Sequence, residues 1–153
     1  MKASAKINYP VEDVFNIFIK AAKKDFKDFN EEDPIGCKIV KKIESAGSRR
    51  PECTIEITDY VENSKYEITT SNNVSSCKST YTFVQKKDGY TVVSCEESQG
   101  GNGFMDSMTL MLVRFMAGRA FKKRFAVQME TLENQLKTRE ENLQRSEKKD
   151  TNN

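Results

Sequence analysis

Apolar residues recur with a helical period near the start of the chain. After Pro10 they fall at positions i, i+3, i+4, i+7 and i+11, on Val11, Val14, Phe15, Phe18 and Ala22. Acidic residues open this segment and lysines close it, which suits the dipole of a helix. The pattern predicts an amphipathic helix of about four turns. Residues 2–8, which precede it, alternate and predict a strand.

Between residues 37 and 97 the period of the apolar positions changes to two. Turn residues interrupt this region at intervals of about 8 to 14 residues, as in an antiparallel meander. We expect strands at 37–44, 53–60, 66–71, 77–85 and 90–97, with a hairpin turn at Lys87, Asp88 and Gly89. Together with residues 2–8 these segments make a sheet of six strands.

Alternation also predicts which side chains face the core. The expected inner residues of three strands are Cys53, Ile55, Ile57, Tyr66, Ile68, Thr70, Cys77, Ser79, Tyr81 and Phe83. The last strand is ambiguous, because either the set that includes Val92 or the alternate set is apolar enough to face inward. We favour the alternate set, which is Thr91, Val93, Cys95 and Glu97.

A helical period returns after the glycine-rich segment 99–103 and lasts for about 35 residues. Its apolar stripe contains Phe104, Met108, Met111, Phe115, Gly118, Phe125, Met129, Leu132 and Leu136. From Thr138 onward the sequence is charged and polar, so we expect residues 138–153 to form a disordered tail after a domain of residues 1–137. The element order predicts an α+β helix-grip fold, in which a curved six-stranded antiparallel sheet wraps around a long C-terminal helix.

Charge and hydropathy narrow the possible partners and the location. The 25 basic and 23 acidic residues nearly cancel, so no global field favours nucleic acid. No window holds the roughly 20 apolar residues that a membrane span needs. The N-terminus lacks the apolar core and cleavage site of a secretory signal, and we expect a cytoplasmic protein.

The chain contains no histidine, and this absence excludes several kinds of site. It leaves no Ser-His or Cys-His nucleophile, no imidazole metal ligand and no imidazole acid or base. The four cysteines include no C-x-x-C pair, so we expect reduced thiols and neither a metal nor a cofactor.

Three segments carry a resemblance to a known family. Residues 7–15 read I-N-Y-P-V-E-D-V-F, residues 59–63 read D-Y-V-E-N, and residues 103–105 read G-F-M. With the element order, they resemble the START-like superfamily, also called SRPBCC, Bet v 1-like or polyketide cyclase-like. Within it they are similar to an uncharacterised bacterial branch known only as a domain of unknown function. The resemblance implies a cavity between the concave face of the sheet and the last helix, suited to small apolar or amphipathic molecules.

This expectation selects candidate cavity residues on the predicted inner faces and the last helix. They are Ile55, Ile57, Tyr66, Ile68, Tyr81, Phe83, Glu97, Met108, Met111, Leu112 and Phe115. The apolar members also fit a ligand-free core, because a helix stripe that faces a sheet requires no ligand. Burial raises the pKa of a carboxyl group, so an inward Glu97 is the best acid or base candidate.

Three functions follow from these candidates. The first, which we favour, is a non-enzymatic module that binds a small apolar or amphipathic ligand. The second is a cyclase or dehydratase that uses Glu97, Tyr66 or Tyr81. The third is a protein-interaction adaptor, similar to chaperone activators, that binds its partner through basic residues of the last helix. These are Arg114, Arg119, Lys122, Lys123 and Arg124.

Overall fold

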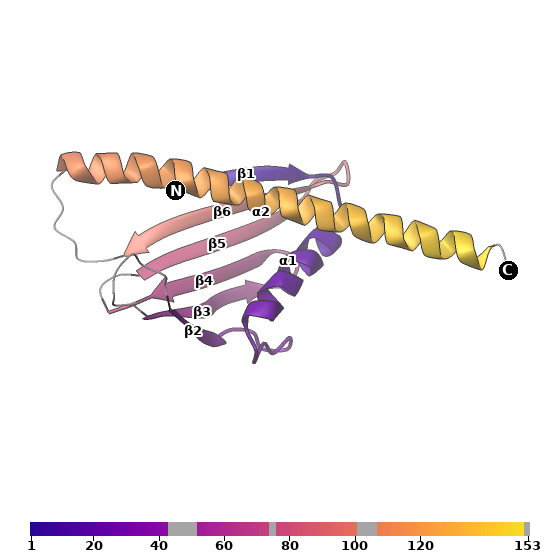
Figure 1. Cartoon of the computed structure of the whole chain (residues 1–153), viewed down its shortest axis with the longest axis horizontal. Helices are drawn as coiled ribbons and strands as arrows, with labels where there is room; N and C mark the ends of the chain where they lie inside the picture. Colours follow the sequence, from indigo (N-terminus) through magenta and orange to yellow (C-terminus); the bar gives the residue numbers. More distant parts are fainter. Residues whose placement is uncertain (43–51, 74–75, 101–106, 152–153) are drawn as a thin grey trace.

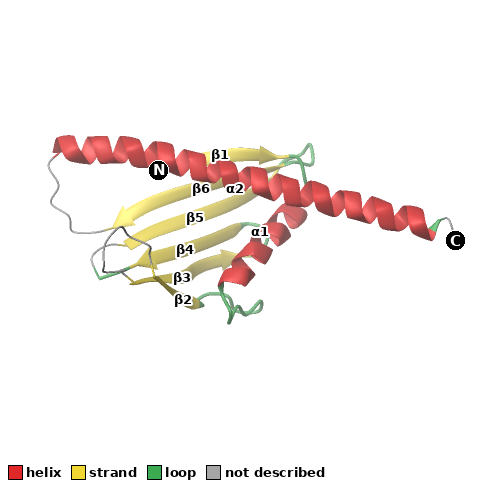
Figure 2. Ribbon diagram, in the orientation of Figure 1, coloured by secondary structure: helices red, strands yellow, loops and turns green. Residues whose placement is uncertain are grey.

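The protein is a six-stranded sheet covered by two helices (Figures 1 and 2). The computed structural model describes residues 1–42, 52–73, 76–100 and 107–151, and within the last helix it describes side chains for residues 118–149. The elements in chain order are β1 (Lys2–Ile7), α1 (Val11–Asp25), β2 (Lys38–Lys42), β3 (Glu52–Val61), β4 (Lys65–Ser71), β5 (Ser76–Gln85), β6 (Thr91–Gly100) and α2 (Ser107–Asp150). This is the α+β helix-grip arrangement that the sequence predicts.

The strands form one antiparallel sheet in the order β1-β6-β5-β4-β3-β2. The first strand pairs with the last, and α1 connects it to β2 at the opposite edge. The sheet curves and stays open, and both helices lie on its concave face (Figure 1). The predicted hairpin joins β5 to β6, and Gly89 has the positive φ of 81° that this turn requires.

Alternation correctly predicts the inner face of the sheet. In β6, the favoured set is confirmed, because Thr91, Val93 and Cys95 are almost completely buried. The register of β3 shifts at a bulge between Ile57 and Asp59. The bulge changes the face that the following residues occupy, and Tyr60 packs against the core beside Phe15.

Aromatic side chains of α1 fill the space above the middle strands. Phe15 lies edge-on to Phe83 with ring centroids 5.1 Å apart, and Phe18 makes the same kind of contact at the same distance. Phe18 also lies 4.8 Å from the ring of Tyr81. The apolar face of the predicted amphipathic helix α1 therefore packs on the sheet.

The long helix α2 crosses β1, β6 and α1 (Figure 1). Among residues 118–149 of this helix, the buried apolar side chains follow three-and-four spacing and are Phe121, Phe125, Met129, Leu132 and Leu136. Beyond them α2 continues to Asp150, where the sequence analysis expects disorder from Thr138. Glutamate, lysine, arginine and glutamine have high helix propensity, so this polar segment extends a helix that is already nucleated.

Two contacts hold the start of this extension against the N-terminal part of the chain. The hydroxyl of Tyr9 donates a hydrogen bond to Glu140 Oε2 over 3.0 Å. Arg139 lies 3.2 Å from Asp13 in an ion pair. Arg139 and Glu140, which fall in the predicted disordered tail, therefore contact the folded domain.

Candidate ligand cavity

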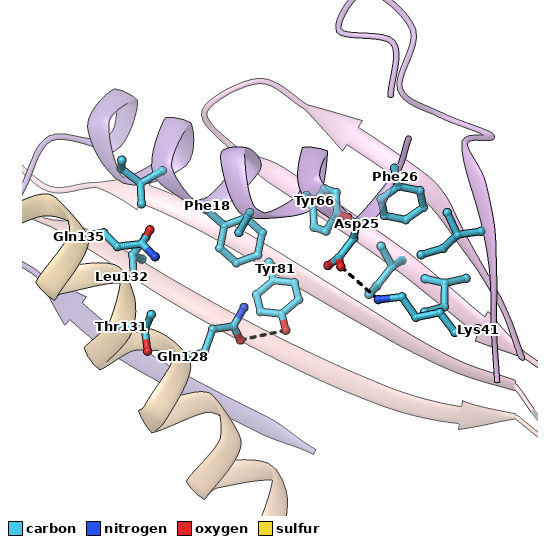
Figure 3. Close-up of a pocket in the computed structure, with 16 residues that line it drawn as sticks. Phe18, Asp25, Phe26, Lys41, Tyr66, Tyr81, Gln128, Thr131, Leu132 and Gln135 are labelled. Atoms are coloured by element: carbon cyan, nitrogen blue, oxygen red, sulfur yellow. Dashed lines mark hydrogen bonds and ion pairs between the residues drawn. The ribbon is translucent and has the colours of Figure 1, made fainter. Parts of the chain in front are cut away.

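A cavity of about 400 Å³ lies between the concave face of the sheet, α1 and the middle of α2 (Figure 3). This volume is within the range of about 300 to 1,000 Å³ for small-molecule sites. The lining residues are Ile17, Phe18, Ala21, Ala22, Asp25, Phe26, Ile39, Lys41, Ile55, Tyr66, Ile68, Tyr81, Gln128, Thr131, Leu132 and Gln135. Most are apolar, and the polar members are spread along the wall.

A polar contact connects the sheet to α2 across the cavity. The hydroxyl of Tyr81 on β5 donates a hydrogen bond to Gln128 Oε1 on α2 over 3.2 Å (Figure 3). Burial raises the pKa of Tyr81 far above its ordinary value. The phenol therefore stays protonated at neutral pH and serves as a hydrogen-bond donor, not as a base.

A second phenol has no such partner. Tyr66 on β4 is 4% exposed and lines the same cavity. Within the described residues, no group is hydrogen-bonded to its hydroxyl. Burial, and secondarily the carboxylate of Asp25, raise the pKa of Tyr66 far above its ordinary value. This neutral donor is therefore available to an acceptor atom inside the cavity.

An ion pair stands at one end of the cavity. Lys41 Nζ on the edge strand β2 lies 3.1 Å from Asp25 Oδ1 at the end of α1 (Figure 3). Both side chains are at least half exposed, so the pair contributes at most about 1 kcal/mol to stability. It closes one end of the cavity with groups that solvent can separate.

Four of the predicted cavity residues, Ile55, Tyr66, Ile68 and Tyr81, line this space. Ile57 and Phe83 are instead buried in the core and do not border it. Four further candidates lie outside the residues whose side chains are described, and these are Met108, Met111, Leu112 and Phe115.

Glu97 faces inward, as expected, but lies outside the lining of the cavity. Its Oε2 is 3.5 Å from a guanidinium nitrogen of Arg124 on α2, and its Oε1 accepts a weak hydrogen bond of 3.4 Å from Ser79. Protein groups thus engage both oxygens, which weakens the case for Glu97 as the acid or base of a cavity reaction. Its neighbour Glu96 is exposed.

The model of the family described as Domain of unknown function (DUF3284) matches residues 1–118. The chain belongs to this family. The predicted resemblance to a bacterial domain of unknown function is confirmed. No curated protein matches the chain.

Solved structures place this DUF3284 member among START-like folds. A protein of unknown function from Staphylococcus aureus aligns with a TM-score of 0.62 at 10% identity, covering 92% of this chain and 96% of the other. A START superfamily protein from Mycobacterium smegmatis gives 0.59 at 10% identity, with coverage of 90% and 97%. Norcoclaurine synthase from Thalictrum flavum, in complex with dopamine and hydroxybenzaldehyde, gives 0.59 at 6% identity, with coverage of 89% and 84%. At these identities the likeness concerns the fold alone.

Three polar residues that α2 contributes to the cavity in this DUF3284 member are not among the residues predicted from the sequence. Gln128, Thr131 and Gln135 follow each other at spacings of three and four, beside the apolar stripe. That polar row was a visible signal, because positions i, i+3 and i+7 share one helix face. The contribution of α1 through Ile17 and Ala21 had no comparable signal, since it depends on where the two helices cross.

The remaining candidates lie elsewhere on the molecule. Arg119, Lys122 and Lys123 are exposed on α2, Arg124 pairs with Glu97, and the side chain of Arg114 lies outside the described part. All four cysteines are free thiols. Among the described residues, no three potential metal ligands come together. In the same part of the chain, no helix is apolar and long enough to cross a membrane.

Proposed function

We propose that this protein binds a small apolar or amphipathic molecule in the cavity between the sheet and α2. The observation that carries the proposal is the Tyr66 hydroxyl, which has no partner among the described residues and belongs to a mostly buried side chain that lines a cavity with largely apolar walls. A hydroxyl that no protein group engages can donate its hydrogen bond to an acceptor atom of a ligand in the cavity. The apolar wall supplies the affinity, and Tyr66 orients the ligand.

The fold likeness supports the same interpretation. Norcoclaurine synthase, whose structure contains dopamine and hydroxybenzaldehyde, shares the arrangement of sheet and helix. The cavity of this chain combines tyrosines with a glutamine, a threonine and aliphatic side chains. An aromatic or aliphatic molecule with one hydrogen-bond acceptor matches these groups.

Binding without catalysis is the form of the proposal that the geometry favours. The two cavity phenols, Tyr66 and Tyr81, have strongly raised pKa values and stay neutral near pH 7. Neither is suited to remove a proton, and Glu97 is held by Arg124 outside the lining. The carboxylate in the cavity lining, Asp25, is paired with Lys41 over 3.1 Å.

A cytoplasmic location accompanies this proposal. The four cysteines are unpaired, including the buried Cys53 and Cys95. Free thiols are usual in a reducing compartment, where disulfides seldom form.

A cavity-filling substitution tests the proposal. Ile68→Trp places an indole in the cavity, while Val40→Trp adds the same group to the solvent-exposed face of β2 as a matched control. The probe is N-phenyl-1-naphthylamine, a neutral dye that fluoresces in apolar sites. We expect the wild type and Val40→Trp to bind it and Ile68→Trp to lose at least tenfold in affinity. Equal binding by all three, with unfolding temperatures that show folded proteins, would contradict the proposal.

A further inference from the structure

A groove lies next to the cavity, along the two helices. It runs between α1 and the C-terminal part of α2, and Ile17, Ala21, Thr131 and Gln135 line both spaces. The remaining groove residues are Lys20, Lys24, Asn134, Thr138, Arg139, Asn142, Leu143 and Ser146. The cavity and the groove are therefore adjacent, and an elongated molecule that reaches from one into the other would pass the four shared residues.

The groove differs from the cavity in its charge. Lys20 and Lys24 are one helical turn apart on α1, on the same face as Ile17 and Ala21, and both are exposed. Neither makes an ion pair within the described residues. Among these residues, no acidic side chain lines the groove. Arg139 is the third cation, but it already pairs with Asp13 over 3.2 Å.

The opposite wall offers neutral polar groups. Asn134, Gln135 and Asn142 present side-chain amides on α2 along the groove. The hydroxyls of Thr138 and Ser146 are already used, since they donate to backbone carbonyls one turn earlier. Two unpaired ammonium groups that face amides, next to an apolar cavity, have the chemistry that binds an anionic head group.

We infer that the ligand is an anionic amphiphile, with its apolar part in the cavity and its carboxylate or phosphate in the groove at Lys20 and Lys24. This inference rests on the proposed function, and it adds the charge and the orientation of the ligand. The ammonium groups stay hydrated at the groove opening, so their attraction is moderate and depends on salt. Two such contacts correspond to a preference of about 2- to 30-fold for the anion over a neutral molecule of the same length.

Competition against N-phenyl-1-naphthylamine tests this inference. The competitors are decanoate, decyl phosphate and 1-decanol, which share one chain and differ in the head group. We expect both anions to displace the dye at lower concentration than 1-decanol in the wild type at low salt. The ratio between decanoate and decyl phosphate then distinguishes a carboxylate ligand from a phosphate ligand.

Substitutions of Lys20 and Lys24 test whether the preference for anionic competitors comes from the groove. The double substitution Lys20→Gln and Lys24→Gln is expected to remove the preference and to leave 1-decanol binding unchanged. Lys20→Arg with Lys24→Arg should retain the preference. Lys86→Gln with Lys87→Gln removes the same charge at the exposed β5–β6 turn and serves as the matched control.

The outcomes separate the two proposals. If 1-decanol displaces the dye but the anions are no better, or if the Lys20 and Lys24 variant keeps the preference, the inference about charge is wrong and the proposed function stands. If no competitor displaces the dye and Ile68→Trp binds it as well as the wild type does, both proposals are wrong.

Discussion

Tyr81 of β5 and Gln128 of α2 are joined by a hydrogen bond of 3.2 Å between the hydroxyl and Oε1. Both residues line the cavity, so this bond connects the sheet on one side of the cavity to α2 on the other. Burial and the neighbouring Cys95 thiol raise the pKa of Tyr81. The proton of the bond therefore stays on the phenol throughout the neutral range, and the helix is attached to the sheet by a neutral donor and a neutral acceptor.

A double-mutant cycle measures what this attachment contributes. Tyr81→Phe and Gln128→Leu each remove one partner, and we expect a coupling of about 0.5–1 kcal/mol between them in the free energy of unfolding. Urea denaturation of the four proteins gives this value. The cycle cancels the separate contact between Tyr81 and Cys95. Strictly additive effects would mean that the bond does not hold α2 on the sheet.

The Tyr66 hydroxyl is expected to affect ligand affinity more than stability. Tyr66→Phe removes a donor that has no partner among the described residues, so the free energy of unfolding should change by less than about 1 kcal/mol. Binding of a ligand with an acceptor in the cavity should weaken about 3- to 10-fold. Calorimetric titration with 4-hydroxybenzaldehyde and with toluene checks this, since toluene has no acceptor and should bind both proteins equally.

A loss of stability in Tyr66→Phe without any loss of 4-hydroxybenzaldehyde affinity would contradict this role. Tyr90→Phe is the matched control, because the Tyr90 ring lies outside the cavity and packs under Lys6.

A buried carboxylate on the other face of the sheet makes stability depend on pH. Glu67 on β4 is 8% exposed and accepts hydrogen bonds from Thr58 and Thr80, at 2.9 and 2.8 Å, beside Lys78 at 3.3 Å. Burial alone raises the pKa of a carboxyl group, but these donors outweigh burial and lower the pKa of Glu67 below its ordinary 4.5.

The sign of the pH effect follows from this lowered pKa. The ionised carboxylate stabilises the fold above pH 4.5, and that contribution is lost as the pH falls through the lower pKa of the folded state. Glu67→Gln should cost about 1–3 kcal/mol at pH 7 and flatten the decline of stability below pH 4.5. Glu96→Gln, at an exposed ion pair with Lys2, should change neither. Parallel pH curves for wild type and Glu67→Gln would refute the assignment.

Two leucines on α2 mark where the core ends. Leu136 is 2% exposed, whereas Leu143, two turns later, is 57% exposed. Leu136→Ala should therefore destabilise the protein by about 2–5 kcal/mol, because it removes buried methyl groups and leaves a cavity. Leu143→Ala should change the free energy of unfolding by less than about 0.5 kcal/mol. Chemical denaturation compares the two, and similar losses would show that the core continues along the helix.

The local spacing of apolar residues in the sequence was sufficient to predict most of the fold. The period-two segments located the strands, and alternation selected Val93 and Cys95 as inner residues, because one face of a curved sheet must be apolar. The start of α1 could be read from Pro10, which fixes the backbone where the helix begins. These features depend on near neighbours in the chain, so the sequence contains them directly.

The cavity depended on the crossing of elements far apart in the chain. The helical period of α2 does not distinguish residues that border the cavity from residues in the core. Only the angle at which α2 crosses α1 places Gln128 and Gln135 at the open space and Phe121 in the core. That crossing depends on the long-range packing of α2 against α1 and β1. A periodic pattern predicts which face of a helix packs on the sheet, but tertiary structure alone decided which residues of the two helices border the open space, because that depends on where distant elements cross.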